Sequence, residues 1–380
     1  MSLMLRSPST YVLADIVLIE NFTNLHVGSG GAEGLVDLPI QRDEFGYPVL
    51  YSSSIKGSLK TCLLHTTTNN VVYVLFGPDP EEGETFESSI AILEGYLFAI
   101  PARSLRGVYV YVTSPILLKR FLERIELYAK FDQESLVNVD SVGQEAKDVI
   151  KKIQYSFQSL VEEARERLGV DNAICLGDKQ EIEIKVKGPL EGCAVLVEEF
   201  VLKILEPKRG VDGELLDMLG FDKPLLLLHD DIAKEVIDRS LVRYTRIRLR
   251  RETKTVEEGG LWTEEYLPLK SKFHTVLLYK RPPLTDTFIR KILDRVEEVD
   301  DNAYLESLKK LGILSEGDIE ELKNSKEEAQ LLLAEKIRSY LHRRIENNLK
   351  SFIIMGGKET LGKGIVKLNF LTSKAGREVS

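Results

Sequence analysis

Apolar residues cluster early in the chain and predict buried β-strands. The first cluster, YVLADIVLIE (residues 11–20), is rich in β-branched residues and runs directly into a glycine-rich segment. Beyond that segment, three serines (52–54) precede Ile55, Leu59 and Leu63, whose spacing places them on one face of a helix. The pattern therefore predicts a strand, a long loop and then a helix.

The middle of the chain mixes strand and helix patterns. Residues 91–101 predict a second strand, and valines that alternate with tyrosines over residues 108–112 predict a third. Pro115 then opens an amphipathic helix that we expect to end near residue 130. Residues 133–168 are acidic and helical in period, which predicts an inserted arm or lid. The stretches EIEIKVKG (181–188) and AVLVEEFVLKIL (194–205) predict further strand or strand–helix elements.

The last third predicts a hairpin, a helical segment and two final strands. The hairpin begins with a basic strand at Arg243, turns at VEEGG (256–260), and returns through LWTEEYLPL and HTVLLYK as far as residue 280. Residues 285–349 have a helical period and many charges. The stretch SFIIMGGKETLGKGIVKLNFL (351–371) predicts two strands around a glycine-rich loop.

Length and composition place the chain among ordinary globular proteins. Its 380 residues, 43% of them hydrophobic, suffice for at least one full core. The three cysteines are odd in number and form no C-x-x-C pair, which argues against a disulfide framework and a thiolate zinc site. We therefore expect a reducing, cytoplasmic compartment. No apolar stretch reaches the length of a membrane span, and the first residues do not resemble a signal peptide.

The net charge of −9 argues against a protein that holds nucleic acid by bulk positive charge. A nucleic-acid partner would have to meet a local basic stripe. RYTRIRLRRETK (243–254) is such a stripe, with five arginines and one lysine against one glutamate. It has two interpretations, a solvated strand face or an RNA contact.

The loop GKETLGKG (357–364) approaches a phosphate-binding P-loop but departs from it in two ways. Gly364 stands where a magnesium-binding serine or threonine is required, and a strand pattern follows where a helix is needed. We therefore exclude a nucleotide-triphosphate site. The loop is either a wide hairpin turn or a backbone-amide surface for RNA phosphates, to which Lys358 and Lys363 add charge.

Two residues of the first glycine-rich segment are candidates for chemistry. None of the five histidines lies three or four residues from another, so no histidine metal motif is present. His26 differs from the other four because it opens the glycine-rich segment, eleven residues before Asp37. Asp37 precedes Leu38-Pro39, where an aspartate is often a turn or cap residue. The neighbouring glycines, His26 and the lysines at 56 and 60 favour a functional role.

Four motifs together resemble one known family. The stretches at 25–60 and 356–368 resemble the N-terminal signature and the C-terminal glycine-rich loop of the RAMP superfamily of CRISPR proteins. The stretches IPARSLRGVYVYVTSP (100–115) and ETKTVEEGGLWTEEYLP (252–268) resemble the repeated backbone subunit of the type III-B effector, the Cmr complex. The four motifs lie in order and span most of the chain.

The resemblance implies an α+β fold with a ferredoxin-like (RRM-type) palm, inserted helical fingers and a thumb β-hairpin. It divides the chain into six parts. These are a first palm part (1–132) with a catalytic loop (26–50), an inserted helical or finger segment (133–180), a palm continuation (181–242), a thumb-like basic hairpin (243–280), a helical segment (285–350) and C-terminal palm strands with the glycine-rich loop (351–380).

The resemblance also implies an endoribonuclease that works within an assembled complex. Its partners would be guide CRISPR RNA, target RNA, copies of itself and other Cmr subunits, with no membrane. Matched onto this sequence, Asp37 is the catalytic residue, with His26 as a second candidate. A divalent cation, Mg²⁺ or Mn²⁺, would serve cleavage, with Asp37 as a candidate ligand. The RNA-binding candidates are Ser54, Lys56, Lys60, Arg103, Arg106, Arg243, Arg246, Arg248, Arg250, Lys358 and Lys363.

The sequence leaves two alternatives open. The chain could be a structural RAMP subunit that binds RNA without catalysis, or the backbone subunit of the type III-A (Csm) complex. The role of Asp37 separates the catalytic from the structural interpretation.

Overall fold

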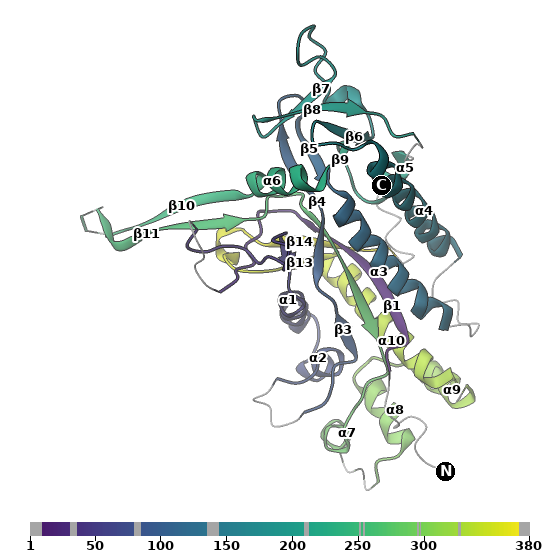
Figure 1. Cartoon of the computed structure of the whole chain (residues 1–380). Helices are drawn as coiled ribbons and strands as arrows, with labels where there is room; N and C mark the ends of the chain where they lie inside the picture. Colours follow the sequence, from purple (N-terminus) through teal and green to yellow (C-terminus); the bar gives the residue numbers. More distant parts are fainter. Residues whose placement is uncertain are drawn as a thin grey trace.

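The computed structural model describes residues 10–30, 36–79, 85–134, 144–208, 213–250, 252–253, 255–294, 296, 298–325 and 328–371. Within them, twelve strands form one mixed sheet (Figure 1). Ten strands follow one path in the order β13 (Phe352–Ile354), β14 (Ile365–Phe370), β1 (Leu13–Asn21), β12 (Lys272–Tyr279), β4 (Gly95–Ser104), β5 (Val108–Thr113), β9 (Leu225–Leu228), β6 (Asn172–Leu176), β8 (Phe200–Leu205) and β7 (Cys193–Leu196). The short strands β2 (Val49–Leu50) and β3 (Ile90–Ile92) pair with β4 and β12.

Part of this sheet closes on itself. The path from β4 through β5, β9, β6 and β8 to β7 returns to β4, because Ser104 of β4 pairs with Leu196 of β7. The pairs β5–β9 and β6–β8 are parallel, and the other pairs are antiparallel. The fold is therefore α+β with a barrel-like part, as the sequence predicts at the level of class.

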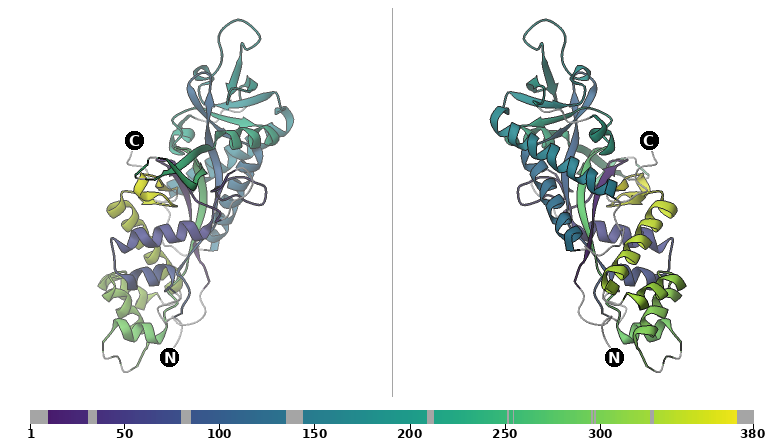
Figure 2. Two further views of the ribbon diagram at one scale, coloured as in Figure 1. Left: turned by 90° about the vertical axis from the view of Figure 1, so that its left-hand side faces the viewer. Right: turned by 90° about the vertical axis from the view of Figure 1, so that its right-hand side faces the viewer.

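Helices cover both faces of the sheet and extend one end of the molecule (Figure 2). The helices of the described part are α1 (Ser52–Leu64), α2 (Asn69–Phe76), α3 (Pro115–Glu134), α4 (Gln144–Arg167), α5 (Gly213–Met218), α6 (Asp230–Ser240), α7 (Asp286–Ile292), α8 (Asp301–Lys310), α9 (Glu316–Asn324) and α10 (Ala329–Arg343). Not one of these helices is long and apolar enough to cross a membrane.

The strand β1 is buried on both faces, which explains its nearly continuous apolar sequence. Its side chains alternate between two cores, because successive residues of a strand point to opposite faces. Val17 and Ile19 pack in the core that contains α1, α2 and α10. Ile16 and Leu18 pack in the core that contains α3 and α4.

Asp15 is the charged exception in β1 and joins the C-terminal helical segment to the sheet. It is fully buried, and its carboxylate accepts hydrogen bonds from Arg338 at 2.9 Å and Tyr279 at 2.7 Å. The ring Nε2 of His342 lies 2.7 Å from Oδ2 of the same carboxylate. The helical segment 285–350 is thus fixed to the central strand by a buried ionic cluster.

The strands β10 (Val242–Leu249) and β11 (Val256–Tyr266) form a separate two-stranded sheet that projects from the body (Figure 1). We call it the projecting hairpin. Ile247 and Leu261 face each other across it and are 54% and 62% exposed. We call these two residues the apolar tip pair. Leu249 and Val256, the next pair outward along the hairpin, are also exposed, so the outer part of the hairpin carries several large apolar side chains.

Most of the elements predicted from the pattern are confirmed. The predicted strand at 11–20 is β1, and the predicted helix after the three serines is α1, with Ile55, Leu59 and Leu63 buried as expected. The helix opened by Pro115 is α3, and the two terminal strands are β13 and β14. Residues 285–349 are helical, as α7 to α10.

Other predictions need correction. The predicted strand at 91–101 is two strands, β3 and β4. The stretch 181–188 is not a strand: a short 3-10 turn, Lys179–Glu181, leads into irregular backbone before β7. The predicted turn VEEGG lies inside β11, and the chain reverses between Leu249 and Val256 instead. The strand pairing shifts in register there, between Ile247 and Leu249, which is typical of a β-bulge. A Cβ on Gly260 would lie 2.8 Å from the carbonyl oxygen of Glu257, so the bulge requires glycine at this position.

Two predicted segments also sit differently from the expectation. The helix within 133–168 packs on α3 through Ile153, Phe157 and Leu160, which are buried, so α4 is not a detached arm. The strand that contains HTVLLYK is β12, which leaves the projecting hairpin and pairs with β1. The hairpin therefore ends at Tyr266, where the chain enters the large sheet.

Candidate catalytic loop and RNA interface

The first glycine-rich segment lies along the root of the projecting hairpin. We call it loop 25–42, of which residues 31–35 lie outside the described part. Leu25 pairs with Leu267 in an antiparallel bridge, and Leu38 pairs with Glu264 in a parallel bridge. Gly28 and Ile40 pair with each other. The loop is therefore a narrow arch whose second arm runs beside β11.

Asp37 is exposed on this arch and is held by Thr263 of β11. The backbone N–H and the hydroxyl of Thr263 both donate to Oδ2 of Asp37, at 2.7 and 2.9 Å. The N–H of Asp37 donates in return to the threonine hydroxyl at 3.0 Å. These hydrogen bonds lower the pKa of Asp37, the backbone bond most and the hydroxyl bond next. The carboxylate therefore stays ionised at neutral pH.

Glu265 fixes the arch to the hairpin and to α6. Its carboxylate is buried and accepts hydrogen bonds from Arg42 at 3.3 Å and from Arg243 at 3.1 Å. Arg42 also pairs with Asp238 of α6 at 2.6 Å. A buried carboxylate must be paired to be tolerated, and two arginines supply the pairing.

Glu264 points to the opposite face of the strand and forms a second buried cluster. It accepts hydrogen bonds from Lys358 at 2.8 Å, Trp262 at 2.7 Å, Arg246 at 3.2 Å and the hydroxyl of Tyr266. Burial opposes its ionisation, but the bonds from Lys358, Tyr266 and Trp262 outweigh burial and lower its pKa to about 2. The loop 356–364 is thereby tied to the hairpin.

His26 faces inward rather than toward Asp37's exposed surface. It is buried, its Nδ1 lies 2.7 Å from the carbonyl oxygen of Glu265, and its ring packs against Tyr266. Gly356 touches it so closely that a Cβ there would lie 2.2 Å from the carbonyl oxygen of His26. Only glycine fits that position, which also has a φ of +75°. His26 thus joins the two glycine-rich loops.

The first turn of α1 lies beside the arch, and α1 carries three of the RNA-binding candidates. Gln41 donates to the hydroxyl of Ser54 at 2.9 Å and accepts from the N–H of Tyr51 at 2.8 Å. Lys60 pairs with Asp79 at 2.5 Å. Lys56 forms no ion pair with a described residue, and burial, with Lys60 nearby, lowers its pKa. The N-terminus of α1 therefore presents a helix dipole and one lysine outside any ion pair of the described part.

Some of the remaining basic candidates are held in ion pairs with buried glutamates, and others are free to contact RNA. Arg243, Arg246 and Lys358 are bound by the two buried glutamates described above. Lys363 lies over the rings of Tyr244 and Tyr266, each at 5.6 Å. Arg248 pairs with Glu257 only at 3.9 Å and is 68% exposed, so most of its guanidinium group is open to RNA. No acid of the described part pairs with Arg250, which is also exposed.

Arg103 and Arg106 belong to another region. They lie at the β4–β5 turn, where Arg103 pairs with the exposed Glu198 at 2.9 Å and Arg106 donates to the carbonyl oxygen of Glu183 at 2.6 Å. The structure therefore does not place them beside Asp37 or the first turn of α1.

No cluster of three or more potential metal ligands occurs among the described residues. Asp43, an acid close to Asp37 in sequence, is unavailable because it pairs with Arg120 and accepts the N–H groups of Phe45 and Tyr47. Glu33 lies outside the described part. Asp37 is thus the candidate ligand that this part supplies, and these residues alone do not build a metal cage.

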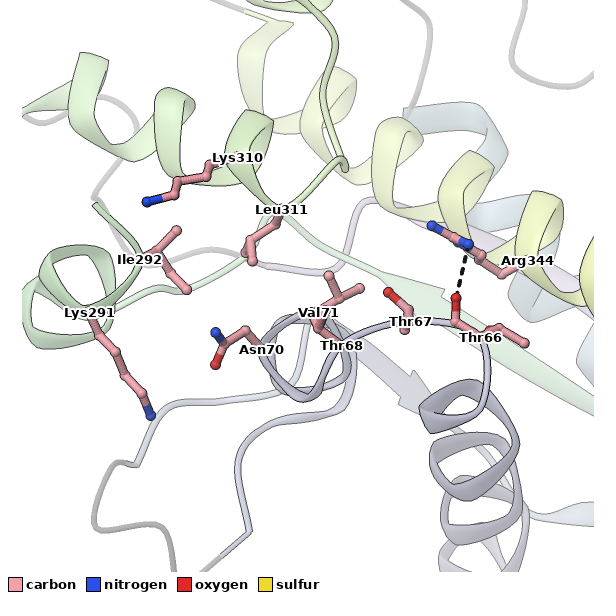
Figure 3. Close-up of a pocket in the computed structure, with 10 residues that line it drawn as sticks. All are labelled: Thr66, Thr67, Thr68, Asn70, Val71, Lys291, Ile292, Lys310, Leu311 and Arg344. Carbon is pink, nitrogen blue, oxygen red and sulfur yellow. Dashed lines mark hydrogen bonds between the residues drawn. The ribbon is translucent and has the colours of Figure 1, made fainter. Parts of the chain in front are cut away.

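A cavity of about 470 Å³ lies elsewhere, between the α1–α2 connection and the C-terminal helices (Figure 3). Arg344 donates to the carbonyl oxygen of Thr66 at 3.1 Å on one side, while the side chains of Lys291 and Lys310 extend on the other and do not meet. Lys310 lies 3.5 Å from Asp294. None of the candidate residues lines this cavity, so it is not part of the candidate site.

Sequence reasoning missed the residues that hold the site together: Arg42, Gln41, Thr263, Glu264 and Glu265. The stretch LWTEEYLPL predicts only a returning strand. Its two adjacent acids do carry a signal, because neighbours in a strand point to opposite faces and two buried acids need two sets of cations.

These features agree with the comparison to known families: a glycine-rich arch carries Asp37, and a basic hairpin is joined to that arch on one face and to a C-terminal glycine-rich loop on the other. The chain belongs to the RAMP superfamily, whose family model matches residues 18–367.

Within this superfamily, the chain is similar to proteins of Cmr complexes. The chain is 32% identical over 373 residues to the CRISPR system CMR subunit Cmr4 of Saccharolobus solfataricus, covering 95% of this chain and 97% of that protein. It is 31% identical over 270 residues to the CRISPR system Cmr endoribonuclease Cmr4 of Pyrococcus furiosus, covering 70% of this chain and 81% of that protein. Among solved structures, it is similar to a chain of the type III-B Cmr-beta complex bound to cognate target RNA, with a TM-score of 0.64, 30% identity and coverage of 95% and 98%.

Proposed function

We propose that this chain is a repeated backbone subunit of a type III-B CRISPR effector, which binds guide RNA along a filament and cleaves complementary target RNA at regular intervals. The observation that carries this proposal is the attachment of an ionised aspartate, Asp37, to the root of a projecting basic hairpin. The names of the relatives, a Cmr subunit and a Cmr endoribonuclease, support the same activity. Such a subunit would act in the cytoplasm with copies of itself and other Cmr subunits.

The chemistry needs both the hairpin and the aspartate. A ribose 2′-OH can attack the adjacent phosphate only when it lies in line with the leaving 5′-oxygen, and stacked A-form geometry prevents this. Inserting a side chain between bases costs a few kcal/mol and frees the backbone to rotate. The apolar tip pair, Ile247 and Leu261, is exposed and suited to this insertion. Asp37 would then orient the hydroxyl.

Guide RNA would lie at the first turn of α1. Backbone N–H groups at a helix N-terminus and the ammonium group of Lys56 form an anion site for a phosphate, and Ser54 is held there by Gln41. Lys363, Arg248 and Arg250 would contact RNA from the C-terminal loop and the hairpin. Arg243, Arg246 and Lys358 would contribute mainly by keeping the hairpin root rigid, since each is bound to a buried glutamate.

The architectural part of the proposal assigns the sheet around β1, β12, β4 and β14 to a ferredoxin-like palm. The projecting hairpin would be the thumb, and the finger segment would be 133–180. The palm would continue in 181–242 and 351–380, with 285–350 as a helical addition that Asp15 anchors.

A divalent cation forms a further part of the proposal. Mg²⁺ or Mn²⁺ is held in many nucleic-acid enzymes by one or two carboxylates together with phosphate oxygens and water, which fits a site whose described acid is Asp37. Such an ion would stabilise negative charge that develops on the phosphate. The orienting role of Asp37 does not depend on it.

A guide-loaded complex purified through a tag on this chain should cut complementary target RNA at regular spacing. The products should end in a cyclic phosphate and a 5′-hydroxyl, because the attacking group is the ribose 2′-OH. Electrophoresis beside alkaline-hydrolysis ladders measures spacing and end chemistry, and a chelator of divalent ions in a parallel reaction tests for the cation. Intact target after prolonged incubation would contradict the catalytic proposal.

The second candidate function is a guide-holding subunit without catalysis. It is favoured by one observation, that Thr263 already occupies Oδ2 of Asp37, as a capped loop residue would require. In that case target binding would persist and no cut would appear.

RNA retention should depend on the available cations of the hairpin. Replacing Arg248 or Arg250 with alanine should weaken RNA binding and reduce the slope of log K against log salt by about one for each phosphate that the variant no longer neutralises. Arg239→Ala is a charge-matched control, because Arg239 lies on α6 and is paired with Glu199 and Glu235. Equal slopes in all three variants would assign the hairpin arginines to a solvated face.

A further inference from the structure

Thr263 contacts Asp37 through its backbone and its side chain at once. Its two donors converge on Oδ2, at 2.7 and 2.9 Å, and Oδ1 accepts no hydrogen bond from the described residues. Asp37 is exposed, so packing does not restrict its rotation. Two donors on one oxygen fix the plane of the carboxylate and leave the other oxygen available to a substrate.

The position of Thr263 on the hairpin relates Asp37 to the apolar tip pair. Thr263 faces Thr245 across the hairpin, and the next pair outward on the same face is Ile247 with Leu261. A strand rises about 3.3 Å per residue, so Leu261 lies roughly 7 Å beyond Thr263 along β11. This spacing is comparable to one or two nucleotides of a single strand.

We propose that Thr263 is a positioning residue that fixes the orientation of the Asp37 carboxylate and its spacing from the apolar tip pair. The inference rests on the function proposed above. It adds that a single chain determines which phosphate of the target is cut. The strand β11 carries both a side chain that disrupts the duplex and the residue that holds the carboxylate.

The chemistry explains why such a restraint matters. An orienting carboxylate acts only when it meets the 2′-OH in its in-line geometry, and a displacement of about 1 Å can cost about 100-fold in rate. The threonine hydroxyl supplies one of the two hydrogen bonds that hold Oδ2 of Asp37 in place, and the backbone N–H supplies the other.

The test compares three variants in the guide-loaded complex. Thr263→Val keeps the shape of the side chain and the backbone N–H but removes the hydroxyl, and Thr263→Ser restores the hydroxyl. Thr245→Val is the matched control, because it makes the same change on the facing strand, where no contact with Asp37 exists among the described residues. Single-turnover cleavage, target affinity and complex size are measured for each.

Thr263→Val should slow cleavage about 10- to 100-fold, with target affinity within about twofold and the complex intact. Thr263→Ser should recover most of the rate, and Thr245→Val should match the unaltered complex.

Two results would overturn the inference. A Thr263→Val complex with an unaltered cleavage rate would show that the hydroxyl does not position Asp37. Loss of assembly or of target affinity together with cleavage would assign Thr263 to folding alone. If Asp37→Asn itself cleaved normally, the proposed function would fail, whereas an inactive Asp37→Asn beside a normal Thr263→Val would contradict only the inference.

Discussion

Replacing Asp37 with asparagine or alanine should slow target cleavage by the assembled complex at least about 100-fold while guide and target binding persist. Orienting or proton-transferring groups contribute about 10²- to 10⁴-fold to rate, so cleavage should fall by that range. Binding should change little, because one loop carboxylate adds nothing favourable to the binding of a polyanion. Asparagine is the sharper change, since its carbonyl oxygen can still accept from Thr263 and preserve the arch.

The measurement is single-turnover cleavage of labelled target beside target affinity and complex size. Glu44→Gln is a matched control, because Glu44 is an exposed acid seven residues further along the chain, just beyond loop 25–42. Regular cleavage that survives Asp37→Asn would remove Asp37 from the mechanism and make His26 the next residue to test. Loss of the complex itself would indicate that Asp37 only caps the loop before Leu38.

Asp15→Ala should destabilise the chain by about 3–5 kcal/mol, the largest stability effect that we expect from a single substitution. The carboxylate is fully buried in β1, and its removal leaves the buried guanidinium of Arg338 without its main partner. The hydroxyl of Tyr279 and the ring of His342 lose an acceptor as well. Urea unfolding followed by circular dichroism measures the decrease in stability.

Glu198→Ala is the control for this substitution. Glu198 also pairs with an arginine, Arg103, but both side chains are largely exposed, and such pairs contribute about 0–1 kcal/mol. If Asp15→Ala cost no more than Glu198→Ala, the buried cluster would not be what joins the helical segment to β1.

Local pattern suffices for much of the fold, because apolar period and helix caps are properties of adjacent residues. β1, α1 and α3 follow from it directly. Local pattern gives the wrong prediction at VEEGG, where glycines that are typical of a turn lie at a bulge in β11. Whether the glycines form a turn or a bulge depends on how Ile247 and Leu249 pair with the opposite strand. The stretch 181–188 fails for a related reason: Ile184 makes backbone hydrogen bonds with Gly192 and Cys193, but these local contacts do not continue into a strand ladder.

In the candidate site, too, the sequence predicts what depends on adjacent residues and does not predict contacts between distant ones. Asp37 stands out because glycines and basic residues surround it in sequence. Its contact with Thr263 could not be anticipated, because the two residues are 226 positions apart. The sequence also does not show which arginines are free to contact RNA. Arg243 and Arg246 form ion pairs with Glu265 and Glu264, and these pairs depend on the register of the folded hairpin.

The opposite directions of Glu264 and Glu265 have a mechanical consequence for the projecting hairpin. One carboxylate ties the root to loop 356–364, and the other ties it to Arg42 and through it to α6. The root of the hairpin is thus fixed to the body of the protein on both faces of β11. We therefore expect the hairpin to bend in its outer span rather than at the root, so that a force on Ile247 and Leu261 does not tilt the strands that hold Asp37.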